Sequence, residues 1–151
     1  MLMKRLLAPL FAAALFTGGA ALAVDDLQAL TGKWSVKKTN DEGQVFTQTV
    51  EVNKDKFVFE ILGADAALVF HGEGNFKLEK LGTFSCARFL HIRAGRSASE
   101  MRDVDDEYVL IYTLDGDAWT TAFNFDRQRD RQKPSLDVYQ RVKTGAAKPA
   151  Q

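Results

Sequence analysis

Three side chains could support covalent or metal chemistry, namely Cys86, His71 and His91. A thiol beside an imidazole can act as nucleophile and base, and closely spaced sets of such ligands bind zinc. The sequence has no zinc-type spacing, Gly-x-Ser-x-Gly motif or glycine-rich phosphate loop around them. The apolar neighbours of Cys86 instead indicate a buried thiol. We therefore expect no enzymatic activity, no metal and no cofactor.

Two charged segments could bind ions or anionic groups. Residues 103–107 concentrate carboxylates as a calcium site would, but they lack the Asp-x-Asp-x-Asp-Gly order of a calcium loop. Residues 126–134 carry three arginines and one lysine, with Asp126 and Asp130 interleaved. Since the acidic residues offset part of the positive charge, both segments are interpreted as solvated loops.

Aromatic residues are the stronger candidates for a binding site. Six of them occur in segments where apolar and polar residues alternate, as expected for one face of a β-sheet. They are Phe46, Phe59, Phe70, Tyr112, Phe123 and Phe125. On the inner face of a closed barrel, such residues either fill the interior or line a cavity for one small ligand. The sequence leaves both alternatives open.

The elements that position these residues are short strands, rich in Phe, Val, Thr, Tyr and Trp, at intervals of about ten residues. We expect strands over 32–39, 46–52, 57–61, 68–72, 75–81, 83–92, 108–114, 119–125 and 136–142. Segments 40–43, 53–55, 63–65 and 115–116 are predicted turns, and 93–107 and 126–134 are predicted loops. The parity of strand 83–92 is ambiguous because its apolar residues fall on both faces.

This pattern predicts an all-β protein, an eight- to nine-stranded antiparallel up-and-down barrel. Closure into a barrel would leave few exposed strand edges. A short helical turn is expected first, with Asp25 or Asp26 as its cap and Leu27 and Leu30 on one face.

The N-terminus has the features of a secretory signal peptide over residues 1–23. Lys4 and Arg5 precede an apolar stretch too short to span a bilayer, and the small-residue triplet ends at Ala23. We therefore expect export to the periplasm or the medium, a barrel domain over 24–143 and a disordered tail over 144–151.

Removal of residues 1–23 leaves 128 residues with 18 basic and 20 acidic side chains. This near-neutral balance does not favour nucleic-acid binding, which normally requires a large basic excess. A single cysteine excludes an internal disulfide, but a chain of this length can bury an adequate core without one. We expect a monomer without a transmembrane segment.

Several residues carry a resemblance to a known family. They are Leu30, Gly32 and Trp34 after the helical turn, the hairpin over 111–117, and Arg141 in the last strand. With this spacing the chain resembles the lipocalin-like branch of the calycin barrels, and more narrowly the small exported lipocalin-like domains of unknown function found in planctomycetes. The resemblance implies that Arg141 packs across Trp34 in a cation-π contact at the closed end of the barrel.

Two functions follow from this expectation. In the first, the barrel binds a small apolar or amphipathic molecule against the aromatic residues. In the second, the barrel is filled, and the chain is an envelope interaction module that binds a protein partner through the polar loops over 93–107 and 126–134.

Overall fold

The computed structural model describes residues 19–97, 99–126 and 133–143, with residues 19–24 described for their backbone only. The expected tail and most of the expected signal peptide lie outside the described residues, as do residues 127–132 of the second polar loop.

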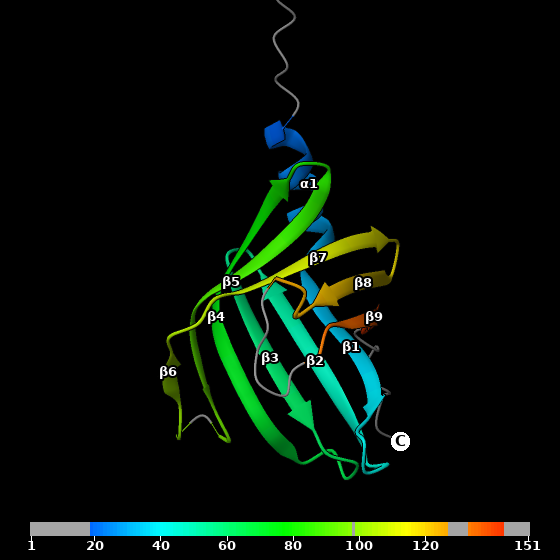
Figure 1. Ribbon diagram of the computed structural model, residues 1–151, viewed down its shortest axis with the longest axis vertical. Coiled ribbons are helices and arrows are strands. Elements are labelled where there is room, and N and C mark those ends of the chain that lie inside the picture. Colours follow the sequence, from blue (N-terminus) through cyan, green and yellow to red (C-terminus); the bar gives the residue numbers. More distant parts are fainter. Residues whose placement is uncertain (1–18, 98, 127–132, 144–151) are drawn as a thin grey trace, which may run out of the picture.

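The described strands form one antiparallel sheet that closes into a barrel (Figure 1). They are β1 (Gly32–Thr39), β2 (Val45–Asn53), β3 (Lys56–Leu62), β4 (Leu68–Leu81), β5 (Phe84–Gly95), β6 (Arg102–Val104), β7 (Tyr108–Asp115), β8 (Ala118–Phe123) and β9 (Ser135–Arg141). The order β4-β3-β2-β1-β9-β8-β7-β5 is closed by pairing of β4 with β5, and β6 adds to β5 outside this ring. The predicted all-β, up-and-down barrel is confirmed.

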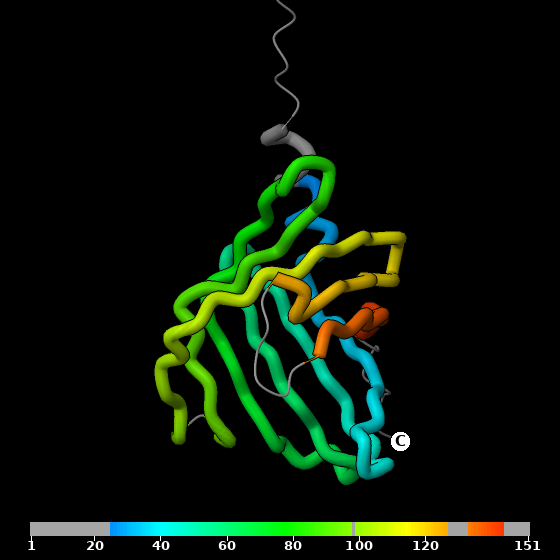
Figure 2. The backbone as a smooth tube through the Cα atoms, in the orientation of Figure 1, coloured from blue at the N-terminus to red at the C-terminus, as the bar shows by residue number. Residues whose placement is uncertain are grey.

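Helix α1 (Gly19–Leu30) lies at the end of the barrel where β1 begins, beside the projecting hairpin of β4 and β5 (Figure 2). It is longer than the predicted turn, so Asp25 and Asp26 lie inside the helix and do not cap it, and that expectation is wrong. Asp26 instead accepts a hydrogen bond of 2.9 Å from the Tyr112 hydroxyl of β7. This bond ties the helix to the barrel wall.

The connection from α1 to β1 forms the closed end of the barrel. Trp34 is fully buried, and its indole nitrogen donates a 2.8 Å hydrogen bond to the Leu30 carbonyl. The guanidinium of Arg141 lies 4.1 Å from the centre of the Trp34 ring and donates to the carbonyls of Ala29 and Thr31. These bonds satisfy carbonyls at the end of the helix, which have no partner within it.

Gly32 is required in this connection for two reasons. Its backbone φ is +120°, a conformation that L side chains rarely adopt. A Cβ at this position would also lie 3.2 Å from Nη1 of Arg141. The Leu-x-Gly-x-Trp sequence therefore has a physical explanation in this structure.

Strand β4 corrects the prediction of two separate strands over 68–72 and 75–81. The strand is continuous, and its register with β5 shifts at a bulge between Glu73 and Asn75. Gly74 lies at this bulge, where a Cβ would come within 2.6 Å of the Leu90 carbonyl oxygen. The glycine that interrupts the sequence pattern thus allows β4 to bend against β5 without ending.

The predicted loop over 93–107 is also wrong in part. Strand β5 continues to Gly95, and β6 pairs with it through Ile92↔Val104. His91 has a positive φ of 49°, and this irregularity changes which residues of β5 face the interior. The inward residues are Ala87 and Phe89 before it and Ile92 and Ala94 after it, which explains the ambiguous parity of this segment.

Eight pairs of neighbouring strands close the barrel, and among them β1 and β9 have the fewest paired residues. Their only paired positions are Trp34↔Arg141 and Ser35↔Gln140. Further along the two strands, the Lys38 ammonium and the Asp137 carboxylate form a 2.9 Å ion pair. Beyond the two paired positions, this side-chain ion pair joins β1 and β9 where paired backbone positions are absent.

Candidate functional site

The barrel encloses a cavity of about 450 Å³. It extends from Trp119, which contacts Trp34 of the closed end, toward the end of the barrel away from α1. The residues that line it come from all nine strands and from Asn124, which follows β8. The volume is within the range of about 300–1,000 Å³ that is typical of small-molecule sites.

One wall of the cavity is aromatic. Phe57 and Phe59 of β3, Phe70 of β4 and Phe89 of β5 project into it because they share the inward parity of their strands. The Phe57 and Phe89 rings meet edge to face with centroids 4.7 Å apart, and the Phe59 and Phe70 rings do so at 6.1 Å. These contacts hold the rings in fixed orientations.

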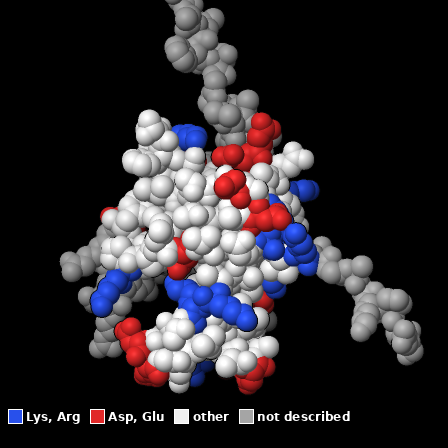
Figure 3. Space-filling view, turned by 90° about the vertical axis from the view of Figure 1, so that its right-hand side faces the viewer, with Lys and Arg blue, Asp and Glu red and all other residues white. Residues whose placement is uncertain are grey.

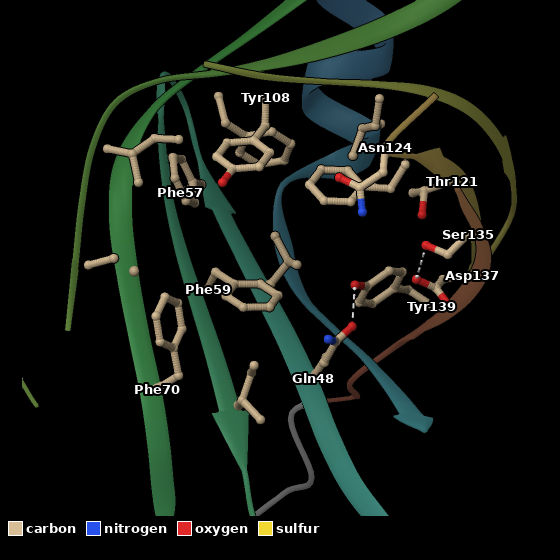
Figure 4. A pocket seen from close by; sticks show the side chains of 18 of the residues that line it. Gln48, Phe57, Phe59, Phe70, Tyr108, Thr121, Asn124, Ser135, Asp137 and Tyr139 are labelled. Atoms are coloured by element: carbon tan, nitrogen blue, oxygen red, sulfur yellow. Dashed lines mark hydrogen bonds between the residues drawn. The ribbon is translucent and has the colours of Figure 1, made fainter. Parts of the chain in front are cut away.

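The opposite wall carries polar groups (Figure 4). The Tyr139 hydroxyl donates a 3.2 Å hydrogen bond to the Gln48 side-chain oxygen, which turns the Gln48 amide nitrogen away from Tyr139. Asp137 accepts hydrogen bonds from Lys38 and Ser135. Thr121 of β8 is paired with Asp137 of β9 and lines the same cavity.

Tyr139 has an elevated pKa. Burial of the phenol and the negative charge of Asp137 both disfavour the phenolate, so they raise the pKa of Tyr139 above its ordinary value of about 10. Burial and the contact with Asp26 raise the pKa of Tyr112 in the same way. Both phenols are therefore neutral at physiological pH.

The raised pKa of Tyr139 predicts a loss of stability in alkali. The pKa of Tyr139 is higher in the folded protein than in the unfolded chain, so its neutral phenol contributes fully to stability below about pH 10. This contribution is lost as the pH rises toward the folded-state pKa. The Tyr139→Phe variant should lose less free energy of unfolding than the wild type between about pH 8 and about pH 11. Urea titrations at several pH values measure this difference. The surface variant Val138→Ala serves as control, and equal slopes for wild type and Tyr139→Phe would refute the interpretation.

The structure brings together three of the six aromatic residues singled out from the sequence. Phe59, Phe70 and Phe123 line the cavity. The other three do not. Phe46 is partly buried on β2, on the cavity side but beyond its lining; Tyr112 is buried beneath α1; and Phe125 is 41% exposed.

Most of the polar wall was missed by sequence reasoning, although strand parity contained the signal. Residues two positions apart on a strand point to the same face of the sheet. Gln48 therefore shares the face of Phe46, Thr121 that of Phe123, and Tyr139 that of Arg141. Phe125 is exposed because β8 ends at Phe123 and Asn124 adopts a left-handed φ of 58°. The alternation therefore stops two residues before the sequence pattern does.

Cys86, His71 and His91 do not form one site. Cys86 of β5 lies opposite Glu79 of β4, whereas His71 of β4 lies opposite Gly95 of β5. Because Cys86 and Gly95 are nine positions apart on β5, Cys86 and His71 are separated by about 30 Å along the sheet. His91 lies five positions from Cys86, about 16 Å along the strand. Burial is the main factor that raises the pKa of the Cys86 thiol, and the nearby Glu79 carboxylate adds to this effect.

The charged segments do not form a metal site in the described part of the chain, where no cluster of three or more His, Cys, Asp or Glu side chains is arranged to hold a cation. Acidic and basic side chains are interspersed on the face shown in Figure 3. No helix within the described residues has the length and apolar character needed to cross a bilayer.

The fold and the cavity together define the class of this protein as a closed eight-stranded antiparallel β-barrel with an internal pocket, an architecture consistent with the lipocalin-like fold. Comparisons with protein-family models, with curated proteins and with solved structures find no match to this chain.

Proposed function

We propose that this chain is a lipocalin-like binding protein that holds one small apolar or amphipathic molecule inside its barrel. The observation that carries the proposal is the cavity of about 450 Å³ with its lining of aromatic side chains. Burial of apolar ligand surface there contributes about 25 cal/mol for each Å² removed from water. Rings that are already held by their neighbours lose little conformational entropy when a ligand binds.

The cavity also distinguishes this proposal from the alternative of an interaction module, which assumed a filled barrel. A packed interior would leave no space of this size beside Phe59, Phe70 and Phe123. The binding function is therefore favoured.

A blocking substitution tests the proposal. Ala94 lines the cavity on β5, so Ala94→Trp should fill part of it and weaken binding of the neutral dye Nile red at least tenfold, or about 1.4 kcal/mol. Ala122→Trp is the matched control, because Ala122 faces outward from β8. Fluorescence titration of both variants, together with native mass spectrometry of protein from its own host, gives the measurement. Absence of any retained or added ligand in the wild type would refute the proposal, as would unchanged dye binding by Ala94→Trp.

We also propose that the chain is exported by cleavage of residues 1–23. The support is the basic, apolar and small-residue order of that segment. Expression of the full chain in a bacterial host should yield a periplasmic or secreted protein that begins at Val24, as read by intact mass and N-terminal sequencing. Accumulation of uncleaved chain in the cytoplasm would contradict export.

A further inference from the structure

We infer that the ligand is a flat, uncharged aromatic molecule that carries a hydroxyl or carbonyl oxygen on one edge. This inference rests on the proposed binding function and names the chemical class of the ligand. It derives from the division of one cavity into an aromatic wall on β3, β4 and β5 and a polar wall that is formed mainly by β2, β8 and β9.

The aromatic wall favours a flat ligand. Phe59 and Phe70 project from β3 and β4 into the space that faces Gln48 and Tyr139 (Figure 4). Above them, the Tyr108 and Phe123 rings lie nearly parallel, with an interplanar angle of 10° and centroids 5.5 Å apart. A planar ring system can make face and edge contacts with several of these rings at once, and such contacts add to the effect of apolar burial.

The polar wall requires oxygen on the ligand. The Gln48 oxygen already accepts from the Tyr139 hydroxyl, so the two N–H groups of the Gln48 amide are left for another acceptor. Among the described residues no acceptor for that nitrogen is present, and Thr121 offers a hydroxyl group on the same wall. A ligand that buried this wall without oxygen atoms would leave these groups without partners, which weakens binding.

The charges favour a neutral ligand over an anion. Among the described residues that line the cavity, Lys38 is the only cation and Asp137 the only anion. They lie 2.9 Å apart, and their side chains are 27% and 13% exposed. Since this pair is already neutral, a ligand carboxylate would meet the Asp137 charge without an unpaired cation to balance it.

A panel of four probes tests the inference: 9-hydroxyphenanthrene, phenanthrene, phenanthrene-9-carboxylate and dodecanol. We expect 9-hydroxyphenanthrene to bind the full chain about fivefold more tightly than phenanthrene, which is the effect of about one hydrogen bond. It should bind at least tenfold more tightly than the carboxylate. Quenching of tryptophan fluorescence provides the signal, because Trp119 lines the cavity.

Two variants locate the effect. Gln48→Leu should bind phenanthrene as the wild type does, which also shows that it is folded, and should lose the preference for the hydroxyl. Thr47→Val, on the outer face of the same strand, should keep the preference.

Each other outcome overturns one of the two proposals. Tighter binding of the carboxylate would refute the inferred neutral ligand and leave the binding function intact. Tighter binding of dodecanol, or a hydroxyl preference that persists in Gln48→Leu, would also refute the inference and leave the binding function intact. If no probe binds and no ligand is retained from the host, the binding function itself fails.

Discussion

Replacement of Trp34 by alanine should lower the free energy of unfolding by about 4 kcal/mol, because it empties the centre of the closed end of the barrel. Trp34 is fully buried, and its ring contacts Trp119 at 5.7 Å and Arg141 at 4.1 Å. The substitution removes all of this contact area, and it also removes the donor of the 2.8 Å hydrogen bond to the Leu30 carbonyl. Small domains are stable by only about 5–15 kcal/mol, so a large fraction of that stability would be lost.

Urea unfolding followed by far-ultraviolet circular dichroism measures the effect. Leu136→Ala is the control, since Leu136 is 71% exposed, and it should change stability by less than about 0.5 kcal/mol. Trp34→Phe keeps an aromatic ring without the N–H and should lose about 1–3 kcal/mol, which keeps the test informative if the alanine variant does not fold. A loss below about 1 kcal/mol for Trp34→Ala would show that the closed end does not depend on this ring.

Replacement of Gly74 by alanine should lower the free energy of unfolding by about 2–3 kcal/mol. The added Cβ would lie 2.6 Å from the Leu90 carbonyl oxygen and 3.0 Å from that of His91. Both atoms belong to the backbone of β5, which is held by its pairing with β4 and β7, so neither can move without distortion of the barrel. A third contact, at 2.9 Å to the Phe57 ring, would displace a residue of the aromatic wall.

Gly72 provides a closely matched control two residues away on the same strand. A Cβ there would have its nearest neighbour, an atom of the Phe70 ring, at 3.6 Å, which is an ordinary van der Waals contact. Gly72→Ala should therefore stay within about 0.5 kcal/mol of the wild type. Equal stability of the two variants in thermal or urea unfolding would contradict the close approach of β4 and β5 at the bulge.

The barrel could be predicted from the sequence because the period-two alternation and the turn residues act locally. Gly43 and Gly116 have positive φ angles of 80° and 55°, as expected for glycines in tight hairpin turns, and strands follow at the predicted places. The two errors in β4 and β5 arise where a bulge interrupts the alternation. A bulge depends on the partner strand, so the sequence of one strand alone does not reveal it.

The candidate site was harder to predict than the fold. Phe59, Phe70 and Phe123 could be chosen because a large apolar residue at an inward position is conspicuous. The polar wall could not be chosen on that basis, because Gln48 and Tyr139 form a polar pair only when the fold brings β2 and β9 together across the barrel. That contact joins residues 91 positions apart in the chain.

The short register between β1 and β9 makes the rigidity of the barrel uneven. Strands β1 and β9 are joined by two paired positions, one further backbone hydrogen bond from Val142 to the Lys33 carbonyl, and the side-chain contacts Lys38–Asp137 and Arg141–Trp34. Strands β1 and β2, in contrast, are joined at eight paired positions. Amide hydrogen exchange should therefore be faster along β9 than along β2. Local opening of the barrel should therefore begin between β1 and β9, while the other strands stay joined through their longer registers.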